Sequence, residues 1–211
     1  MERLAKKIAK AIGVSLGKSD EEVAVVAYGL IGILQVLTIF LAVSAIGLSC
    51  SCWFEVIIVF LSVGFLRRLT GGAHSSDIYG CLIYSVFFVC TLSFLARFLM
   101  PQLPFAVNCA VGVAVFAFGY VMVALKAPVT PPNKPCRTEA KRKRLRKGAF
   151  LVLSVFFVLV VLSFVFGSMV PRLYSVGLAL MLSTFWQIAM MTKCGQKFIA
   201  FFDGLFVRKN R

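Results

Sequence analysis

Two side chains that can do covalent chemistry, His74 and Cys81, lie seven residues apart in the segment RRLTGGAHSSDIYGC (residues 67–81). His74 is the only histidine of the chain. A histidine accepts a proton near neutral pH, and a deprotonated cysteine is a strong nucleophile. The pair is therefore a candidate cysteine-nucleophile site with His74 as the base. On spacing alone, an interfacial histidine and one buried cysteine among several explain the residues better, so their surroundings decide.

The residues that precede Cys81 predict where it lies. Ser75, Ser76 and Asp77 stand before an apolar run, as residues at a helix start do, so Cys81 is expected in the first or second turn. There the positive end of the helix dipole and the nearby arginines favour a thiolate. Asp77 could orient His74 as a third catalytic residue, although a helix cap is the better-supported role.

The pair Gly71–Gly72 gives the chain a way to bring His74 and Cys81 together. On one continuous helix, residues seven apart would hold the two side chains about 10 Å apart, which is too far for proton transfer. Glycine lets the backbone turn tightly, so His74 can fold back over the start of the following helix. The glycines therefore have a mechanistic reason to precede the histidine.

The composition is that of a membrane protein. The chain has 211 residues, is 60% hydrophobic and has a mean hydropathy of +0.93, whereas soluble domains are about 45–50% apolar. Apolar runs of about 20 residues can cross a hydrocarbon core of about 30 Å. One histidine and seven cysteines without metal-ligand spacing predict no metal and no cofactor. We predict an all-α integral membrane protein with a single domain, residues 1–211.

Six transmembrane helices are predicted from the apolar runs. They are expected at about residues 23–48, 48–66, 78–100, 105–125, 149–170 and 173–192. Ahead of them, Leu4, Ile8, Ile12 and Leu16 recur every four residues, with lysines on the other sides. This pattern predicts an N-terminal amphipathic helix over residues 3–18 that lies in the plane of an anionic lipid membrane. A soluble helix packed on the protein is the alternative.

The positive charges predict how the spans are oriented. Of the 23 lysines and arginines, all but Arg97 and Arg172 fall on one side of the six-span layout. Positively charged loops stay on the cytoplasmic side of a bacterial plasma membrane. Both termini and residues 67–81 are therefore expected to face the cytoplasm.

The long loop predicted over residues 126–147 has a proline-rich half and a basic half. The proline-rich half is expected to be extended. The basic half holds six closely spaced cations: Lys141, Arg142, Lys143, Arg144, Arg146 and Lys147. A topology signal that adheres to anionic lipid headgroups explains these charges, and binding of an acidic peptide is the functional interpretation. No nucleic acid partner is expected, because nothing around the run resembles a nucleic-acid-binding module.

Three polar residues fall within or beside the apolar runs. Gln35 is costly in lipid unless it faces the helix bundle, so it could hold a substrate or an oxyanion. Bonding between helices explains Gln35 about as well, and Gln187 supports the same two interpretations more weakly. Glu55 is expected at the outer rim of its span.

The segment 67–81 resembles the signature of the accessory gene regulator B (AgrB) family of membrane peptidases: an arginine, then Gly-Gly-x-His, then a cysteine seven residues after the histidine. The later APVTPPNKP followed by KRKRLRK resembles the proline-rich loop and basic run of the same family. Together with the six-span layout, the resemblance covers the whole chain. Carried over by position, it makes Cys81 the nucleophile and His74 the base. Arg67 and Gly72 become supporting residues, and Gln35 matches a polar residue of the first span.

The resemblance implies a membrane-embedded cysteine endopeptidase that acts on a short, AgrD-like quorum-sensing propeptide. Such a propeptide has an amphipathic leader and an acidic C-terminal tail. The cysteine would release the tail and form an acyl-enzyme thioester, which a cysteine or serine of the substrate would convert into a cyclic thiolactone or lactone autoinducing peptide. The resemblance also suggests a homodimer. A membrane transporter or peptide exporter is the alternative, although the predicted spans hold almost no ionisable groups and show no repeat.

Overall fold

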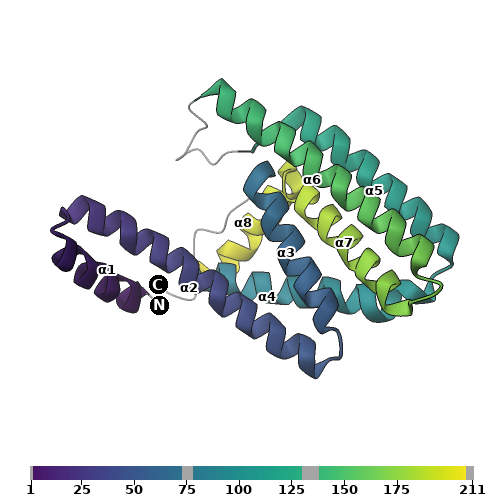
Figure 1. The fold of residues 1–211 in the computed structure, drawn as a ribbon, viewed down its shortest axis with the longest axis horizontal. Helices are drawn as coiled ribbons and strands as arrows, with labels where there is room; N and C mark the ends of the chain where they lie inside the picture. Colours follow the sequence, from purple (N-terminus) through teal and green to yellow (C-terminus); the bar gives the residue numbers. More distant parts are fainter. Residues whose placement is uncertain (1, 73–77, 130–137, 208–211) are drawn as a thin grey trace. The chain divides into compact units, whose positions relative to one another are not determined.

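The computed structural model describes residues 2–72, 78–129 and 138–207, and these residues form helices joined by short turns (Figure 1). The α-helices are α1 (Glu2–Leu16), α2 (Asp20–Ser49), α3 (Trp53–Thr70), α4 (Ile78–Phe94), α5 (Phe105–Lys126), α6 (Glu139–Phe166), α7 (Pro171–Ala189) and α8 (Lys193–Val207). A π-helical turn (Leu95–Leu99) and a 3-10 turn (Met100–Gln102) continue α4. The chain divides into two units, Met1–Val43 and Ser44–Arg211, and each is described by itself below.

The N-terminal unit is built on a helical hairpin of α1 and the beginning of α2. Gly17 makes the turn between the helices with a positive φ of 59°. Ser19 and Glu22 then cap α2 reciprocally. The Ser19 amide donates to the Glu22 carboxylate at 3.1 Å, and the Glu22 amide donates to Ser19 Oγ at 3.4 Å. A helix therefore begins where a capping box predicts one.

In α1, small residues are buried and large apolar residues are exposed. Ala5 and Ala9 are fully buried, and Gly13 lies directly against the Val23 side chain of α2. The predicted stripe of Leu4, Ile8, Ile12 and Leu16 stays on the outside. The helix ends at Leu16 rather than at the predicted residue 18. Its apolar stripe suits a lipid surface, and its in-plane placement stays a prediction.

In the second unit, α7 is the central helix. It packs against α3, α5 and α6, which Figure 1 shows beside it, and it also contacts the π-helical turn. Small and polar side chains allow the close approach: Gly177 lies against Ser163 of α6, and Ser62 Oγ of α3 donates to Ser183 Oγ at 2.6 Å. Close small-residue contacts and hydrogen bonds between helices hold bundles together in lipid.

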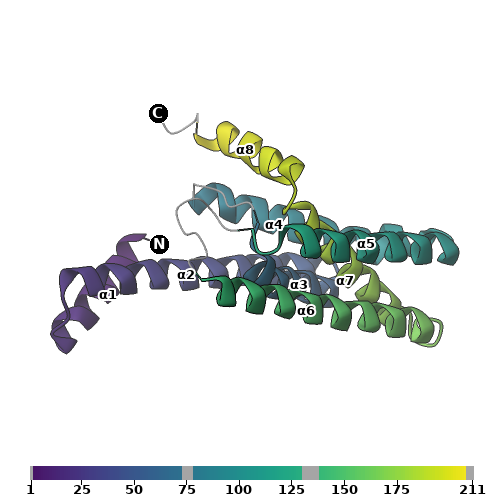
Figure 2. The same cartoon turned by 90° about the horizontal axis from the view of Figure 1, so that it is seen from above.

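Four of the helices are long and apolar enough to cross a membrane: Asp20–Ser49, Tyr79–Gln102, Phe105–Lys126 and Glu139–Phe166. A bent pair, α7 with Lys193–Phe201 of α8, adds a fifth span if the two count as one. The pair turns by 88°, and Figure 2 shows α8 leaving the end of α7. The 18 residues of α3 include three charged ones. The chain is thus a helical membrane protein with four or five candidate spans, and the six-span layout stays a prediction.

Glu55 lies in the first turn of α3, and its side chain is fully buried. Its carboxylate accepts a hydrogen bond from Ser175 Oγ of α7, and Arg97 Nη1 lies 3.9 Å from Oε1. A buried carboxylate is tolerated when cations and hydroxyls surround it. The sequence interpretation did not include these partners because they come from segments far along the chain.

Candidate active site

Cys81 lies at the start of α4, in the position that the helix-start pattern predicts. The helix begins at Ile78, which makes Cys81 its fourth residue, and the Cys81 side chain is half-buried. The first four amides of a helix have no partner within it, and the helix dipole adds positive potential there. This end of α4 therefore suits an anionic group.

Arg67 and Cys81 lie on two helices that pack against each other, α3 and α4. Arg67 lies in the last turn of α3, and Tyr84 lies one turn after Cys81 on α4. Both Arg67 and Cys81 interact electrostatically with the Tyr84 hydroxyl. The end of one helix and the beginning of the next thus supply a cation and a thiol to one region. His74 and Asp77, the other two residues predicted for this region, lie outside the described residues.

The chain leaves α3 through two glycines with positive φ. Gly71 has φ +70° and Gly72 has φ +135°, conformations that strongly favour glycine. The backbone of Gly71 also lies very close to the backbone of Val129. A Cβ atom on residue 71 would lie 1.9 Å from the Val129 carbonyl oxygen. The turn predicted from Gly71 and Gly72 is therefore present. At residue 71, glycine is required both by the positive φ and by the close contact with Val129.

Residues 127–129 begin the proline-rich segment, and they are hydrogen-bonded to the end of α3. The Val129 amide donates to the Thr70 carbonyl at 2.8 Å, in an isolated parallel bridge that pairs Val129 with Gly71. Arg146 Nε of α6 donates to the Ala127 carbonyl at 2.9 Å. The segment therefore links the end of α3 to the beginning of α6. No local sequence pattern predicts a pairing between residues so far apart in the chain.

Gln187, near the end of α7, holds the same turn from another direction. Its Nε2 donates to Thr70 Oγ1 at 3.0 Å and to the Gly71 carbonyl at 2.8 Å. The side chain is only 1% exposed, and its Oε1 has no hydrogen-bond partner among the described residues. The sequence left two interpretations of Gln187: holding a substrate or oxyanion, or bonding between helices. These contacts join α7 to the end of α3 and so fit the second interpretation.

An aromatic cluster fixes the beginning of α4 against α7 and α8. Phe88 stacks on Trp186 with ring centroids 4.0 Å apart, and Phe198 and Tyr84 border the same rings. The Tyr84 hydroxyl lies 3.4 Å from Met190 Sδ. Offset and edge-on ring contacts of this kind stabilise helix packing. The cluster thus orients the helix that carries Cys81, and sequence reasoning missed it because its members come from three helices.

The basic run forms the first turns of α6 rather than part of a loop. The predicted loop over 126–147 is helical at its end, because α6 begins at Glu139. Alanine, lysine, arginine and leucine are good helix formers, and Glu139 complements the helix N-terminus. Five cations are exposed: Lys141, Arg142, Lys143, Arg144 and Lys147. We call these five residues the basic face. Arg146 differs from them because it is half-buried and bonded to Ala127.

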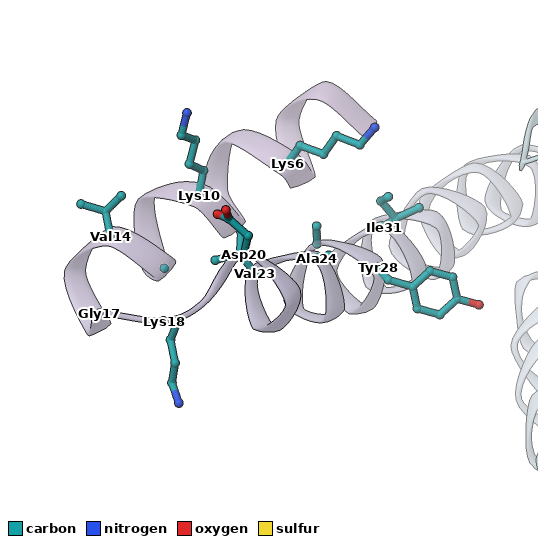
Figure 3. A pocket seen from close by; sticks show the side chains of 12 residues that line it. Lys6, Lys10, Val14, Gly17, Lys18, Asp20, Val23, Ala24, Tyr28 and Ile31 are labelled. Carbon is teal, nitrogen blue, oxygen red and sulfur yellow. The ribbon is translucent and has the colours of Figure 1, made fainter.

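The remaining predicted residue, Gln35, lies half-buried on α2 in the N-terminal unit. That unit contains a hollow of about 700 Å³ between α1 and α2, shown in Figure 3. Val23, Ala24 and Ile31 line it with apolar surface, and lysines lie around it. None of the predicted site residues that the structure describes lines this hollow, so size alone does not identify a catalytic cavity here.

The other described cysteines differ from Cys81 in position. Cys50, Cys52 and Cys90 line a separate cavity of about 270 Å³. Burial raises the pKa of the Cys52 thiol above its ordinary range, and the nearby Cys50 and Glu55 raise it further. A thiol with a raised pKa is a weak nucleophile at neutral pH. Among the described cysteines, Cys81 alone occupies the first turn of a candidate span.

Comparisons with known proteins agree with one another. The sequence profile of the family described as accessory gene regulator B matches residues 2–191. An AgrB-like protein of Clostridium perfringens (strain SM101) is 29% identical over 198 residues, which cover 92% of each chain. An AgrB-like protein of Halalkalibacterium halodurans is 30% identical over 162 residues, covering 77% of this chain and 78% of its own. No solved structure matches the chain.

Proposed function

This chain belongs to the accessory gene regulator B (AgrB) family, and we propose that it is a membrane cysteine endopeptidase that processes a short, AgrD-like propeptide. The observation that carries the proposal is the match over residues 2–191, since it includes the whole segment 67–81. The place of Cys81 in the first turn of α4, which packs against the helix that ends with Arg67, supports the proposal.

In the proposed reaction, His74 takes the proton of the Cys81 thiol, and the thiolate attacks the carbonyl carbon before the acidic tail. The C–N bond breaks, His74 gives the proton to the leaving amine, and the substrate remains on Cys81 as a thioester. A cysteine or serine of the substrate then attacks that thioester and loses its proton to His74. Cys81 leaves as the thiolate, and the product is a cyclic thiolactone or lactone.

The supporting roles follow the family motif. Arg67, at the end of α3, is suited to stabilise negative charge near Cys81, and Gly72 permits the turn before His74. We propose Asp77 as a helix cap that could also orient His74. Gln35 is proposed to hold substrate from the first span. The basic face is proposed to bind the acidic tail, and α1 to meet the amphipathic leader at the lipid surface.

The acyl-enzyme gives the most direct test of this function. A propeptide whose ring-closing residue is alanine should be cleaved but not cyclised, so its N-terminal part should accumulate on Cys81. Intact-mass measurement of the purified protein should show the adduct, and hydroxylamine or an added thiol should remove it. Because an amide is more stable than a thioester, the tail should be removed during the incubation. An enzyme that never carries the adduct, with the tail removed throughout, would overturn the proposal.

The basic face provides a second prediction. Changing Lys141, Arg142, Lys143 and Arg144 to glutamate should weaken processing of an acidic-tailed substrate about tenfold or more, since each exposed ion pair contributes about 0.2–1 kcal/mol. The difference between variant and parent should shrink as salt rises. Steady-state kinetics of tail release at two ionic strengths measure both effects.

Two controls separate binding from other roles of the charges. Changing the exposed Lys193 and Lys197 of α8 to glutamate alters net charge without touching α6, and should leave processing nearly unchanged. Arg146 is kept because it bonds to Ala127. If the α6 variant inserts correctly and processes substrate at the parental rate, the basic face serves only topology and lipid contact.

The orientation in a bacterial plasma membrane is proposed from the charge distribution, with six spans, both termini and the active site on the cytoplasmic side. Single cysteines placed in residues 138–147 and 193–207 should resist impermeant thiol reagents in intact cells and react after lysis. Labelling of residues 138–147 from outside would contradict the six-span arrangement.

A further inference from the structure

The turn after α3 is held by a single buried side chain from α7. Gln187 Nε2 donates both of its hydrogen bonds to neighbouring residues of this turn, at Thr70 Oγ1 and the Gly71 carbonyl. Gly72 follows directly, and a Cβ on it would lie 3.5 Å from Gln187 Nε2 and 3.6 Å from the Met190 carbonyl oxygen. The amide of Gln187 therefore fixes the orientation of the peptide unit between Gly71 and Gly72.

The hydrogen bonds explain why an amide stands at this position. A leucine or methionine would pack in a buried site without the cost of a carbonyl oxygen that lacks a partner, as Gln187 Oε1 does among the described residues. What glutamine adds is two donated hydrogen bonds. One acceptor, Thr70 Oγ1, itself donates to the Leu66 carbonyl within α3, so the contact is continuous with the helix.

Gly72 is the last described residue before the segment that carries the proposed base. In the sequence, His74 follows it by two residues. On the other side of the turn, the Val129 amide holds the Thr70 carbonyl. The segment that carries the proposed base thus starts from a point that is fixed from two directions.

We propose that Gln187 is a positioning residue of the peptidase site: it holds the Thr70–Gly72 turn, from which the chain continues to His74. The inference rests on the proposed function, because it gives His74 and Cys81 their roles as base and nucleophile. Gln187 touches neither the substrate nor Cys81 in this account. It acts through the backbone of the turn.

The test compares Gln187→Leu with Thr184→Val in the full-length protein in detergent micelles or liposomes. Thr184 lies one turn earlier on α7, is also buried, and donates only to Leu180 of its own helix. Gln187→Leu should lower kcat for tail release about ten- to hundredfold with little change in KM, since a small misplacement of a catalytic group costs that much. Thr184→Val should leave both constants close to the parental values.

Alkylation of Cys81 gives a readout that does not need turnover. The rate of reaction with iodoacetamide, followed by peptide mass spectrometry from pH 5 to 9, should depend on His74 if the two side chains meet. Gln187→Leu should shift this pH profile toward that of His74→Ala, whereas Thr184→Val should not. Thr70→Val, which removes one acceptor and keeps the Gly71 bond, should give a smaller shift in the same direction, and should have no further effect when Gln187 is already leucine.

The outcomes separate this inference from the proposed function. If His74→Ala changes the alkylation profile while Gln187→Leu and Thr70→Val leave the profile and kcat unchanged, the positioning role is wrong and the peptidase stands. If Cys81→Ala and His74→Ala still release the tail, the peptidase proposal itself fails. Thr70→Val keeps the test decisive where Gln187→Leu does not fold.

Discussion

Replacing Cys81 with alanine is expected to abolish release of the propeptide tail, and replacing His74 with alanine to reduce it by about a hundred- to ten-thousandfold. The first change removes the only proposed nucleophile. The second removes the only imidazole of the chain, so no other histidine can accept the thiol proton. Tail release measured by mass spectrometry, with each variant reconstituted at equal concentration in liposomes, gives both numbers.

Two other cysteines provide matched controls for the Cys81 variant. Cys90 lies on the same helix, nine residues later, and its replacement by alanine should leave tail release within about twofold of the parent. Cys52→Ala should behave similarly because burial raises the pKa of that thiol and keeps it from acting as a nucleophile near neutral pH. Tail release by the Cys81→Ala enzyme would favour a protein without proteolytic activity, such as a transporter, over the peptidase.

Gly71→Ala should cause the second large loss. An L-residue at the φ of 70° and ψ of −148° found here is strained by about 1–3 kcal/mol, and its Cβ would collide with the Val129 carbonyl oxygen. The bridge to Val129 or the bond to Gln187 must then break, so the turn moves and the chain before His74 moves with it. We expect kcat for tail release to fall about a hundredfold.

Gly64→Ala is the control for this glycine. Gly64 lies within α3, and a Cβ there would meet nothing within 4 Å, so alanine should be neutral or slightly stabilising through its higher helix propensity. Thermal unfolding in detergent and kinetics of both variants separate folding from catalysis. If the Gly71→Ala variant has the unfolding temperature and the kcat of the parent, the turn geometry has no bearing on activity.

Elements that depend on local sequence were predicted well. The helices Ile78–Phe94 and Phe105–Lys126 and the turn at Gly71–Gly72 lie where apolar runs and glycines place them. These signals act over a few residues, so reading the chain in order is enough to find them. The family, too, was identified from the segment 67–81 and is confirmed by the match over residues 2–191.

Errors arose where a local pattern had two explanations. The basic run of residues 141–147 could be a loop or a helix start, and the structure makes it the beginning of α6. The last apolar run was predicted as one span over 173–192. It ends at Ala189, after which α8 leaves at 88°, and the sequence analysis did not predict a helix there.

By itself, the sequence determined the class of protein and most helix positions, because composition and short-range periodicity fix these. The candidate nucleophile and base were named by the resemblance of the segment 67–81 to a family motif. Only the tertiary structure decided how the turn before His74 is held. Gln187 meets Thr70 across 117 residues, Ser175 meets Glu55 across 120, and Val129 pairs with Gly71. A buried polar group must find its hydrogen-bond partners wherever packing supplies them. Helix packing, which no local pattern encodes, therefore selects which residues support the site.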